Sequence, residues 1–393
     1  METFDAIVVG LGAHGSAAAA ALARRGLSVL GLERFGRGEA FGSSGGWSRM
    51  IRIAHFEHPW LVPMATASWD GWLALEREAG TPLLTRTGGL YGGAAGSAIV
   101  DGARDSVAGH GLAHEVIDAA EIHRRWPVLE PADDTVAILE ERAGWIRIDR
   151  AIEAHLVVAE QAGAQLAFGR RVVDWRPSAG GGVEVETTDG QVVGAEHFVL
   201  TTGPWTAELV PDLELPLTIE REVPMWFRPT VDPASIGADR LPVWVLADAD
   251  TVFYGIPHDP DLGLKVSIHH WGTFVGPDEV ERDVGSAEID RVRAFLRSRM
   301  PAANGELASA KVCLYTNTPD QAFVIDRHPV ARGVALATAC SGHGFKFAPV
   351  IGEILADLAT TGTTTWPIDR FRADRFRPAG HLRQSTDKWR NPS

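Results

Sequence analysis

The first thirty-three residues alternate between short apolar runs and small-residue segments. Residues 4–10 read FDAIVVG, residues 16–25 are rich in alanine, and residues 27–33 read LSVLGLE. Short β-branched runs bounded by glycine are typical of buried strands, and an alanine-rich stretch is typical of a helix packed closely on a sheet. The pattern therefore predicts a strand, a helix and a second strand, which together form a βαβ unit.

Later segments repeat both kinds of pattern. Some are short buried runs, some alternate between apolar and polar positions as an antiparallel sheet does, and some have a helical apolar face. The predicted elements are strands at 196–200 and 334–339, antiparallel strands within 217–227 and 244–270, and helices at 65–79, 286–300 and about 349–359. The mixture predicts an α/β (α+β) protein in which a Rossmann-like domain is joined to an antiparallel sheet.

A glycine pattern lies at the first turn of the βαβ unit. Gly10, Gly12 and Gly15 form G-x-G-x-x-G, and Glu33 ends the second strand. In this motif the first glycine allows the tight turn, the second lets the backbone approach a pyrophosphate, and the third allows helix and strand to pack closely. A carboxylate at the position of Glu33 can bind both ribose hydroxyls and would repel a 2′-phosphate. The motif predicts a dinucleotide site and disfavours NADP.

A second glycine-rich loop helps to decide whether the cofactor is FAD or NAD. The predicted strand at 334–339 runs into SGHGFK, which contains Gly342 and Gly344, and then into the predicted helix near Pro349. A second helix N-terminus can stabilise the negative charge that a flavin gains on reduction. The alternative is a turn that only closes the sheet. We expect FAD as the cofactor.

Length and charge narrow the class of protein further. A chain of 393 residues predicts two domains, and a net charge of −14 without a basic run argues against nucleic acid or an anionic membrane as partners. No segment is apolar enough to span a bilayer, and no signal sequence precedes the first strand. Two cysteines do not form a disulfide framework, so a cytoplasmic location is expected.

Lysine is rare in this chain, which uses arginine almost everywhere else. The four lysines among 37 basic residues are Lys265, Lys311, Lys346 and Lys388. A lysine differs from an arginine in having a compact charge and a pKa that can fall on burial. These positions are therefore candidates for functional sites.

Taken together, four blocks resemble the monomeric sarcosine oxidase and N-methyltryptophan oxidase family. The blocks are FDAIVVGLGAHGS at the start, SRMIRIAH at 48–55, KVCLYTNTPDQAFVIDRHP at 311–329 and SGHGFKF at 341–347. The resemblance covers nearly the whole chain. It implies an FAD domain built from residues 1–87, 145–216 and 313–393, and a substrate-binding domain built from residues 88–144 and 217–312.

The resemblance also implies roles for three residues near the flavin. The counterpart of Cys313 forms a thioether to the flavin 8-methyl carbon, the counterpart of Arg49 lies against the flavin, and that of Arg52 binds the substrate carboxylate. From the sequence alone Cys313 could equally be a buried structural thiol, and we expect Cys340 to be a core residue. Arg49 and Arg52 are three residues apart, which would place them on one face of a helix or turn.

Four further residues receive roles in the same way. The counterpart of Lys346 is a second cation on the substrate carboxylate, and that of Lys265 lies over the flavin and speeds its reaction with oxygen. The counterparts of Tyr254 and His269 position the substrate. We expect Tyr254, Lys265 and His269 to line one face of a sheet with Arg52 opposite. Alternatively, Lys265 lies on an exposed edge and His269 is a packed strand histidine.

One stretch departs from the family pattern. Sarcosine-specific members carry a pair of histidines shortly before the arginines, where this chain has Ser43-Ser44-Gly45-Gly46-Trp47. The change suggests a substrate pocket of different polarity or volume. A bulkier N-alkyl amino acid or a cyclic imino acid is then as well supported as sarcosine.

The resemblance implies a monomeric enzyme that oxidises a secondary amine of the N-alkyl amino acid class to an imine. Reoxidation of the flavin by O₂ would give hydrogen peroxide, and no metal is expected. Two alternatives remain open: an oxidase or dehydrogenase of the glycine or D-amino acid type that acts on primary amines, and a flavin-binding subunit without activity of its own.

Overall fold

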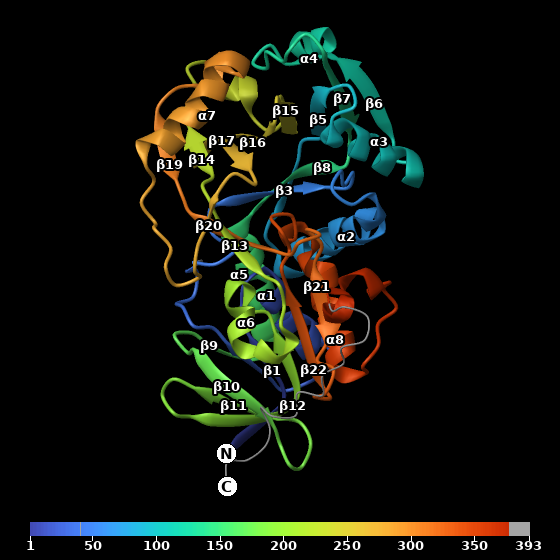
Figure 1. The fold of residues 1–393 in the computed structure, drawn as a ribbon, viewed down its shortest axis with the longest axis vertical. Helices are drawn as coiled ribbons and strands as arrows, with labels where there is room; N and C mark the ends of the chain where they lie inside the picture. The colour runs from blue at the N-terminus through green and yellow to red at the C-terminus, as the bar shows by residue number, and fades with distance from the viewer. Residues whose placement is uncertain (40, 377–393) are drawn as a thin grey trace.

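The computed structural model describes residues 1–39 and 41–376, and it confirms the expected mixed α/β class. An eight-stranded sheet, seen in the lower half of Figure 1, contains the N-terminal βαβ unit. Its parallel strands, in spatial order, are β9 (Gln165–Ala167), β2 (Val29–Leu32), β1 (Glu2–Val9), β12 (Val192–Leu200) and β22 (Val334–Thr338). Antiparallel strands β21 (Val324–Arg327), β10 (Val172–Pro177) and β11 (Val183–Thr187) complete it.

The two faces of this sheet are covered differently. Because side chains alternate along a strand, Ala6 and Val8 of β1 face one apolar core while Ile7 and Val9 face another. The first core is closed by helices α1 (Ala13–Arg24), α2 (Val62–Ala79), α5 (Ile148–Gln161) and α8 (Ala348–Thr360). The second includes residues of β10, β11 and the short helix α6 (Thr206–Leu209). The predicted N-terminal βαβ unit is therefore present.

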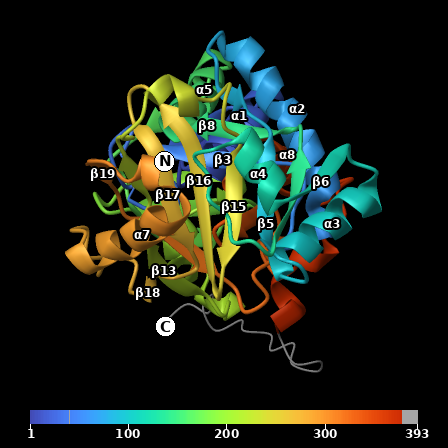
Figure 2. The same cartoon turned by 90° about the horizontal axis from the view of Figure 1, so that it is seen from above.

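A second eight-stranded sheet forms the upper half of the molecule in Figure 1. In spatial order its strands are β19 (Leu307–Ala310), β14 (Met225–Phe227), β17 (Gly263–His269), β16 (Thr251–Asp259), β15 (Val243–Asp248), β5 (Gly89–Ala94), β7 (Thr135–Glu140) and β6 (His114–Asp118). All neighbours are antiparallel except β15 and β5. Helix α7 (Ser286–Arg299) lies at one side, and α3 (Ala98–His110) and α4 (Ala119–Arg125) lie at the other, as Figure 2 also shows.

Two small three-stranded sheets lie between the large ones. One contains β3 (Ser48–Arg52), β8 (Ala143–Arg147) and β4 (Leu84–Arg86), and the other contains β18 (Thr273–Phe274), β13 (Thr218–Glu222) and β20 (Cys313–Asn317). The expectation of a helix or turn around Arg49 and Arg52 was wrong, because residues 48–52 pair with β8 as a strand. Single-turn 3₁₀ helices are found at 59–61, 203–205, 211–213, 233–236, 301–303, 345–347, 369–371 and 373–376.

The remaining predicted elements agree with the structure to within a few residues. The helix expected at 349–359 is α8, although a 3₁₀ turn at 345–347 separates it from the glycine-rich loop. No helix within the described ranges combines the length and apolar character that a bilayer crossing requires. The division into two domains stays a prediction, and Lys388 and the rest of residues 377–393 lie outside the described residues.

Candidate active site

The three N-terminal glycines differ in what an added side chain would contact. A Cβ on Gly10, whose φ is +85°, would lie 2.6 Å from the Thr201 carbonyl oxygen, and one on Gly15 would lie 1.7 Å from the Gly10 carbonyl oxygen. Both glycines are therefore required by the packing of this turn. A Cβ on Gly12 would meet only the Ser44 hydroxyl, at 3.3 Å. The backbone at Gly12 thus leaves free space in front of the helix N-terminus, where a pyrophosphate fits.

Glu33 lies at the carboxyl end of β2 and is anchored by backbone amides. Its two carboxylate oxygens accept hydrogen bonds from the N–H groups of Leu11 (2.8 Å) and Phe35 (3.1 Å). Burial raises the pKa of Glu33, and these amides act against the shift. The carboxylate is therefore held beside the glycine turn, where the acid that binds the ribose hydroxyls lies in dinucleotide-binding βαβ units.

A long cavity extends from Glu33 across the carboxyl ends of the parallel strands. Its lining comes from the glycine turn, the segment after β12 and the loop after β22, and includes Gly10, Gly12, Glu33, Ser44, Thr201, Trp205, Tyr315, Gly342 and Gly344. Ligands of open α/β sheets bind at this edge. An elongated cofactor with a dinucleotide at one end therefore fits the residues that line the cavity.

The second glycine loop is shaped by close packing. Gly342 has a φ of +77°, and a Cβ there would lie 2.4 Å from the Tyr315 ring; one on Gly344 would lie 2.0 Å from the Cys340 Cβ. Cys340 is half-buried, lines the long cavity and packs against the edge of the first apolar core. It follows the last residue of the buried run that ends at Ala339, where the chain turns toward the cavity.

A smaller cavity adjoins the long one. The two share Arg49, Tyr315, Gly342 and Phe345. The smaller cavity is also lined by Met50, Arg52, Phe56, Glu57, Val245, Tyr254, Lys265, His269, His343 and Lys346. All six residues predicted for substrate binding or catalysis therefore lie around one cavity next to the predicted flavin site.

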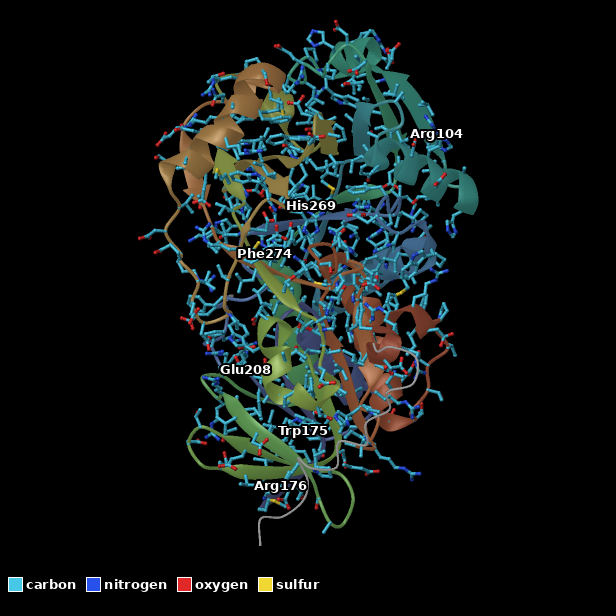
Figure 3. The ribbon with its side chains drawn as sticks, viewed as in Figure 1. Arg104, Trp175, Arg176, Glu208, His269 and Phe274 are labelled. Atoms are coloured by element: carbon cyan, nitrogen blue, oxygen red, sulfur yellow. The ribbon has the colours of Figure 1, made fainter. Side chains whose placement is uncertain are left out.

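Strands β16 and β17 place three of these residues on one sheet face. Lys265 and His269 are four residues apart on β17, and Tyr254 of β16 is paired with Ser267, which lies midway between them. Residues two apart on a strand point to the same side, so all three side chains face the cavity. Figure 3 places His269 between the upper and lower halves of the molecule. The alternative that Lys265 lies on an exposed edge is excluded, because only 1% of this residue is exposed.

The Lys265 ammonium group is almost isolated from other polar groups. Its Nζ donates a hydrogen bond to the Ser48 carbonyl oxygen at 2.8 Å and lies 5.1 Å from the centre of the Tyr254 ring. Burial, and then the neighbouring Arg49, hold the pKa of Lys265 well below its usual value. Negative charge arriving in the cavity would favour the protonated lysine.

Arg52 is held by an acid that the sequence analysis did not single out. Its Nη2 donates to both oxygens of Glu57, its Nη1 donates to the Ala54 carbonyl oxygen at 2.9 Å, and its guanidinium lies 4.1 Å from the centre of the Phe56 ring. Burial alone would raise the pKa of Glu57, but Arg52, together with His55, His343 and Lys346, outweighs it, and the pKa lies well below the usual range. The position of Glu57, five residues after Arg52, gives no sequence signal for this pairing.

Lys346 lies near Arg52 and also lines the small cavity. Its Nζ donates to the His343 carbonyl oxygen, and only 4% of the residue is exposed. Burial, and then Arg52, hold the pKa of Lys346 well below its usual value. The two cations are placed so that an added carboxylate would offset their mutual repulsion.

Cys313 lines neither of the two cavities. The thiol is buried on β20 and does not line the long cavity, although the next three residues, 314–316, do. Burial and the nearby Glu222 raise the pKa of Cys313, while Arg49 and Lys265 act against this shift. The structure thus brings the cysteine beside two cations that favour its thiolate.

The stretch Ser43–Trp47, where the sequence departs from the family pattern, lies at the long cavity. Ser43, Ser44, Gly46 and Trp47 border the long cavity, and none of them borders the small one. The Trp47 ring lies 5.2 Å from the Lys311 ammonium. The inference that this stretch changes the polarity or volume of the substrate pocket is therefore not supported.

Comparison with known proteins agrees with this geometry. Residues 5–358 match the family described as FAD dependent oxidoreductase. The chain belongs to this family. The fit of the long cavity to a dinucleotide cofactor is thus matched by the family's cofactor, FAD, and the protein is an FAD-dependent amine oxidase.

Several relatives are similar over nearly their whole length. The monomeric sarcosine oxidase of Streptomyces avermitilis is 41% identical over 96% of this chain and 99% of its own. The N-methyl-L-tryptophan oxidase of Salmonella dublin is 32% identical over 95% and 99%. Among solved structures, NikD, described as an unusual amino acid oxidase essential for nikkomycin biosynthesis, is 25% identical with a TM-score of 0.83 over 95% of this chain and 98% of its own. The suspected family resemblance is confirmed.

Proposed function

We propose that this enzyme oxidises a secondary amine that carries a carboxylate, of the N-alkyl or cyclic amino acid class, to an imine. The observation that carries the proposal is the pair of buried cations, Arg52 and Lys346, at the small cavity that adjoins the cofactor cavity. Two cations are suited to a carboxylate and select an amino acid over a simple amine. The relatives named sarcosine oxidase and N-methyltryptophan oxidase support the same class.

The chain's own residues would bind and orient the substrate. Arg52 and Lys346 bind the carboxylate, and Tyr254 and His269 border the space left for the amine. FAD, held by Glu33 and the two glycine loops, would supply the two-electron oxidation. Burial lowers the pKa of His269 to about 3, so its ring is neutral at physiological pH and does not repel a cationic substrate. The amine must lose its ammonium proton before oxidation, so activity should rise with pH.

We further propose that oxygen is the electron acceptor and that Lys265 assists its reduction. Electron transfer to oxygen creates an anion, and a preorganised cation stabilises such charge in a water-poor site. Lys265 is buried at the small cavity, and its Nζ donates a hydrogen bond to the Ser48 carbonyl oxygen. The product would be hydrogen peroxide. A monomer is supported by the word "monomeric" in the names of relatives, and cytoplasmic location stays a prediction.

Covalent attachment of the flavin through Cys313 is also a proposal. It rests on the cations near the thiol and on the adjoining cavity residues 314–316. Acid precipitation of the purified protein tests it. Yellow colour should stay in the pellet, be released by Cys313→Ser and be retained by the control Cys340→Ser. Free FAD in the wild-type supernatant would contradict attachment.

A substrate panel tests the main proposal. Purified protein is mixed anaerobically with sarcosine, N-methyl amino acids, L-proline, glycine and D-alanine, and loss of the flavin absorbance is followed. We expect bleaching by the secondary amines and a large rise in KM for Arg52→Met and Lys346→Met. Bleaching by primary amines alone would assign a different substrate class, and no bleaching by any amine would reject the enzyme's proposed role.

A further inference from the structure

Glu140 is a buried carboxylate that the proposed reaction does not use. It is the last residue of β7, and only 2% of it is exposed. Its oxygens accept hydrogen bonds from the backbone N–H groups of Ile53 (3.2 Å) and Ala54 (2.9 Å) and from the Tyr91 hydroxyl. A buried carboxylate is costly unless it is hydrogen-bonded, and these three donors offset that cost for Glu140.

The two backbone groups that Glu140 binds follow Arg52 directly. Strand β3 ends at Arg52, whose partner on β8 is Ala143, so Ile53 and Ala54 lie beyond that pairing. Both residues are buried, and an unbound N–H group there would carry a desolvation cost. Glu140 supplies one oxygen to each. It therefore fixes the backbone at the point where the strand ends.

The same peptide segment binds the Arg52 side chain. The Ala54 N–H donates to Glu140, while the Ala54 carbonyl oxygen accepts from Arg52 Nη1 at 2.9 Å. A chain of hydrogen bonds thus leads from β7 through the backbone of Ala54 to the guanidinium in the small cavity. If Ala54 moved, Arg52 would lose one of the groups that set its direction.

Tyrosine usage gives an independent observation. The chain has three tyrosines. Tyr254 and Tyr315 line the small cavity, and Tyr91 is fully buried, donates its hydroxyl to Glu140 and has its ring centre 6.0 Å from the Arg52 guanidinium. Every tyrosine in this protein therefore lies either at the cavity or in the support of its arginine.

We propose that Glu140, held by Tyr91, is the positioning residue that aims Arg52 at the substrate carboxylate. The proposal rests on the carboxylate-binding role of Arg52 proposed above. Glu140 acts through Ala54, whose carbonyl oxygen accepts a hydrogen bond from Arg52, while the ion pair of Arg52 with Glu57 lies at the small cavity. Substrate specificity then depends on a residue that borders neither cavity among the described residues.

Binding of two matched, non-oxidisable probes to the purified holoenzyme tests the proposal. Tetrahydrofuran-2-carboxylate and its carboxamide differ in charge and share shape, and titration calorimetry gives both dissociation constants. Glu140→Gln should weaken the carboxylate on the order of tenfold and leave the carboxamide nearly unchanged, because a hydrogen-bonded charge is the stronger contact. Tyr91→Phe, a milder change, should weaken the carboxylate alone by a few-fold.

Glu76→Gln is the matched control. Glu76 on α2 also accepts two backbone N–H groups, from Leu83 (2.8 Å) and Leu84 (3.0 Å), but it lines neither cavity. It should leave both dissociation constants unchanged. Equal weakening of both probes by Glu140→Gln and Tyr91→Phe, or no weakening by either variant, would overturn the positioning role. A wild-type enzyme that binds both probes equally would instead reject the proposed function of Arg52.

Discussion

Replacement of Gly342 by alanine should destabilise the protein in two ways, through the left-handed backbone at this position and through a steric clash with Tyr315. Gly342 has a φ of +77°, and an added Cβ would lie 2.4 Å from Tyr315. Carbon atoms pack at about 3.5–4.0 Å, so the ring would have to move by about 1 Å. A left-handed alanine costs about 1–2 kcal/mol, and overpacking of a buried site typically costs a further 1–3 kcal/mol.

Gly190→Ala is the control for the cost of placing an alanine in a left-handed backbone conformation. Gly190 also has a φ of +77°, but nothing lies within 4 Å of its added Cβ. We expect about 1–2 kcal/mol of destabilisation for Gly190→Ala and about 2–5 kcal/mol for Gly342→Ala. Denaturant unfolding of the two variants measures the difference, which isolates the contact with Tyr315.

The same displacement should also have a catalytic consequence. Tyr315 borders both cavities, and its hydroxyl lies 3.4 Å from His269 Nδ1. Gly342→Ala should therefore change the flavin absorbance spectrum and raise KM, whereas Gly190→Ala should alter neither. Equal stability of the two variants, together with unchanged spectra and kinetics, would refute the reasoning.

Three further predictions follow from the buried charges. Lys265→Met should slow reoxidation of the reduced flavin by oxygen far more than anaerobic reduction by substrate, whereas Lys311→Met should change neither; stopped-flow absorbance measures both half-reactions, and equal losses would remove the role of Lys265. Burial raises the pKa of Glu140 to about 6, so the wild-type free energy of unfolding should fall by about 2 kcal/mol relative to Glu140→Gln as the pH rises from about 4.5 through 6. Parallel stability curves for the two proteins over this range would contradict that shift. Glu33→Gln should reduce the FAD content of the purified protein, and undiminished absorbance at the flavin band would argue against ribose binding by Glu33.

The parts of the fold that could be predicted are those whose residue pattern is complete within a short stretch of sequence. The βαβ unit was predictable because the strand periods, the glycine turn and the acid at Glu33 lie within a short stretch of sequence. The strand that carries Arg49 and Arg52 was not, because its five residues become a strand only by pairing with β8, far away in the chain. Its spacing of three fits a helix equally well.

The groups that support the site were harder to predict than the site itself. Glu57, Glu140 and Tyr91 approach Arg52 through tertiary contacts, and Glu140 is separated from Ala54 by 86 positions in the sequence. Trp47 was misjudged for the same reason, since its nearness to the arginines in sequence does not place it in the small cavity. Sequence resemblance identified the cavity residues, and only the fold identifies what holds them.

The two cavities draw on different parts of the chain. Residues between 217 and 312 contribute Val245, Tyr254, Lys265 and His269 to the small cavity and nothing to the long one among the described residues. Mutations on β15, β16 and β17 can therefore reshape the amine pocket while the nucleotide contacts stay intact. Such a separation lets one ancestral scaffold diversify toward new amines by successive changes on three adjacent strands, without passing through variants that have lost their redox group.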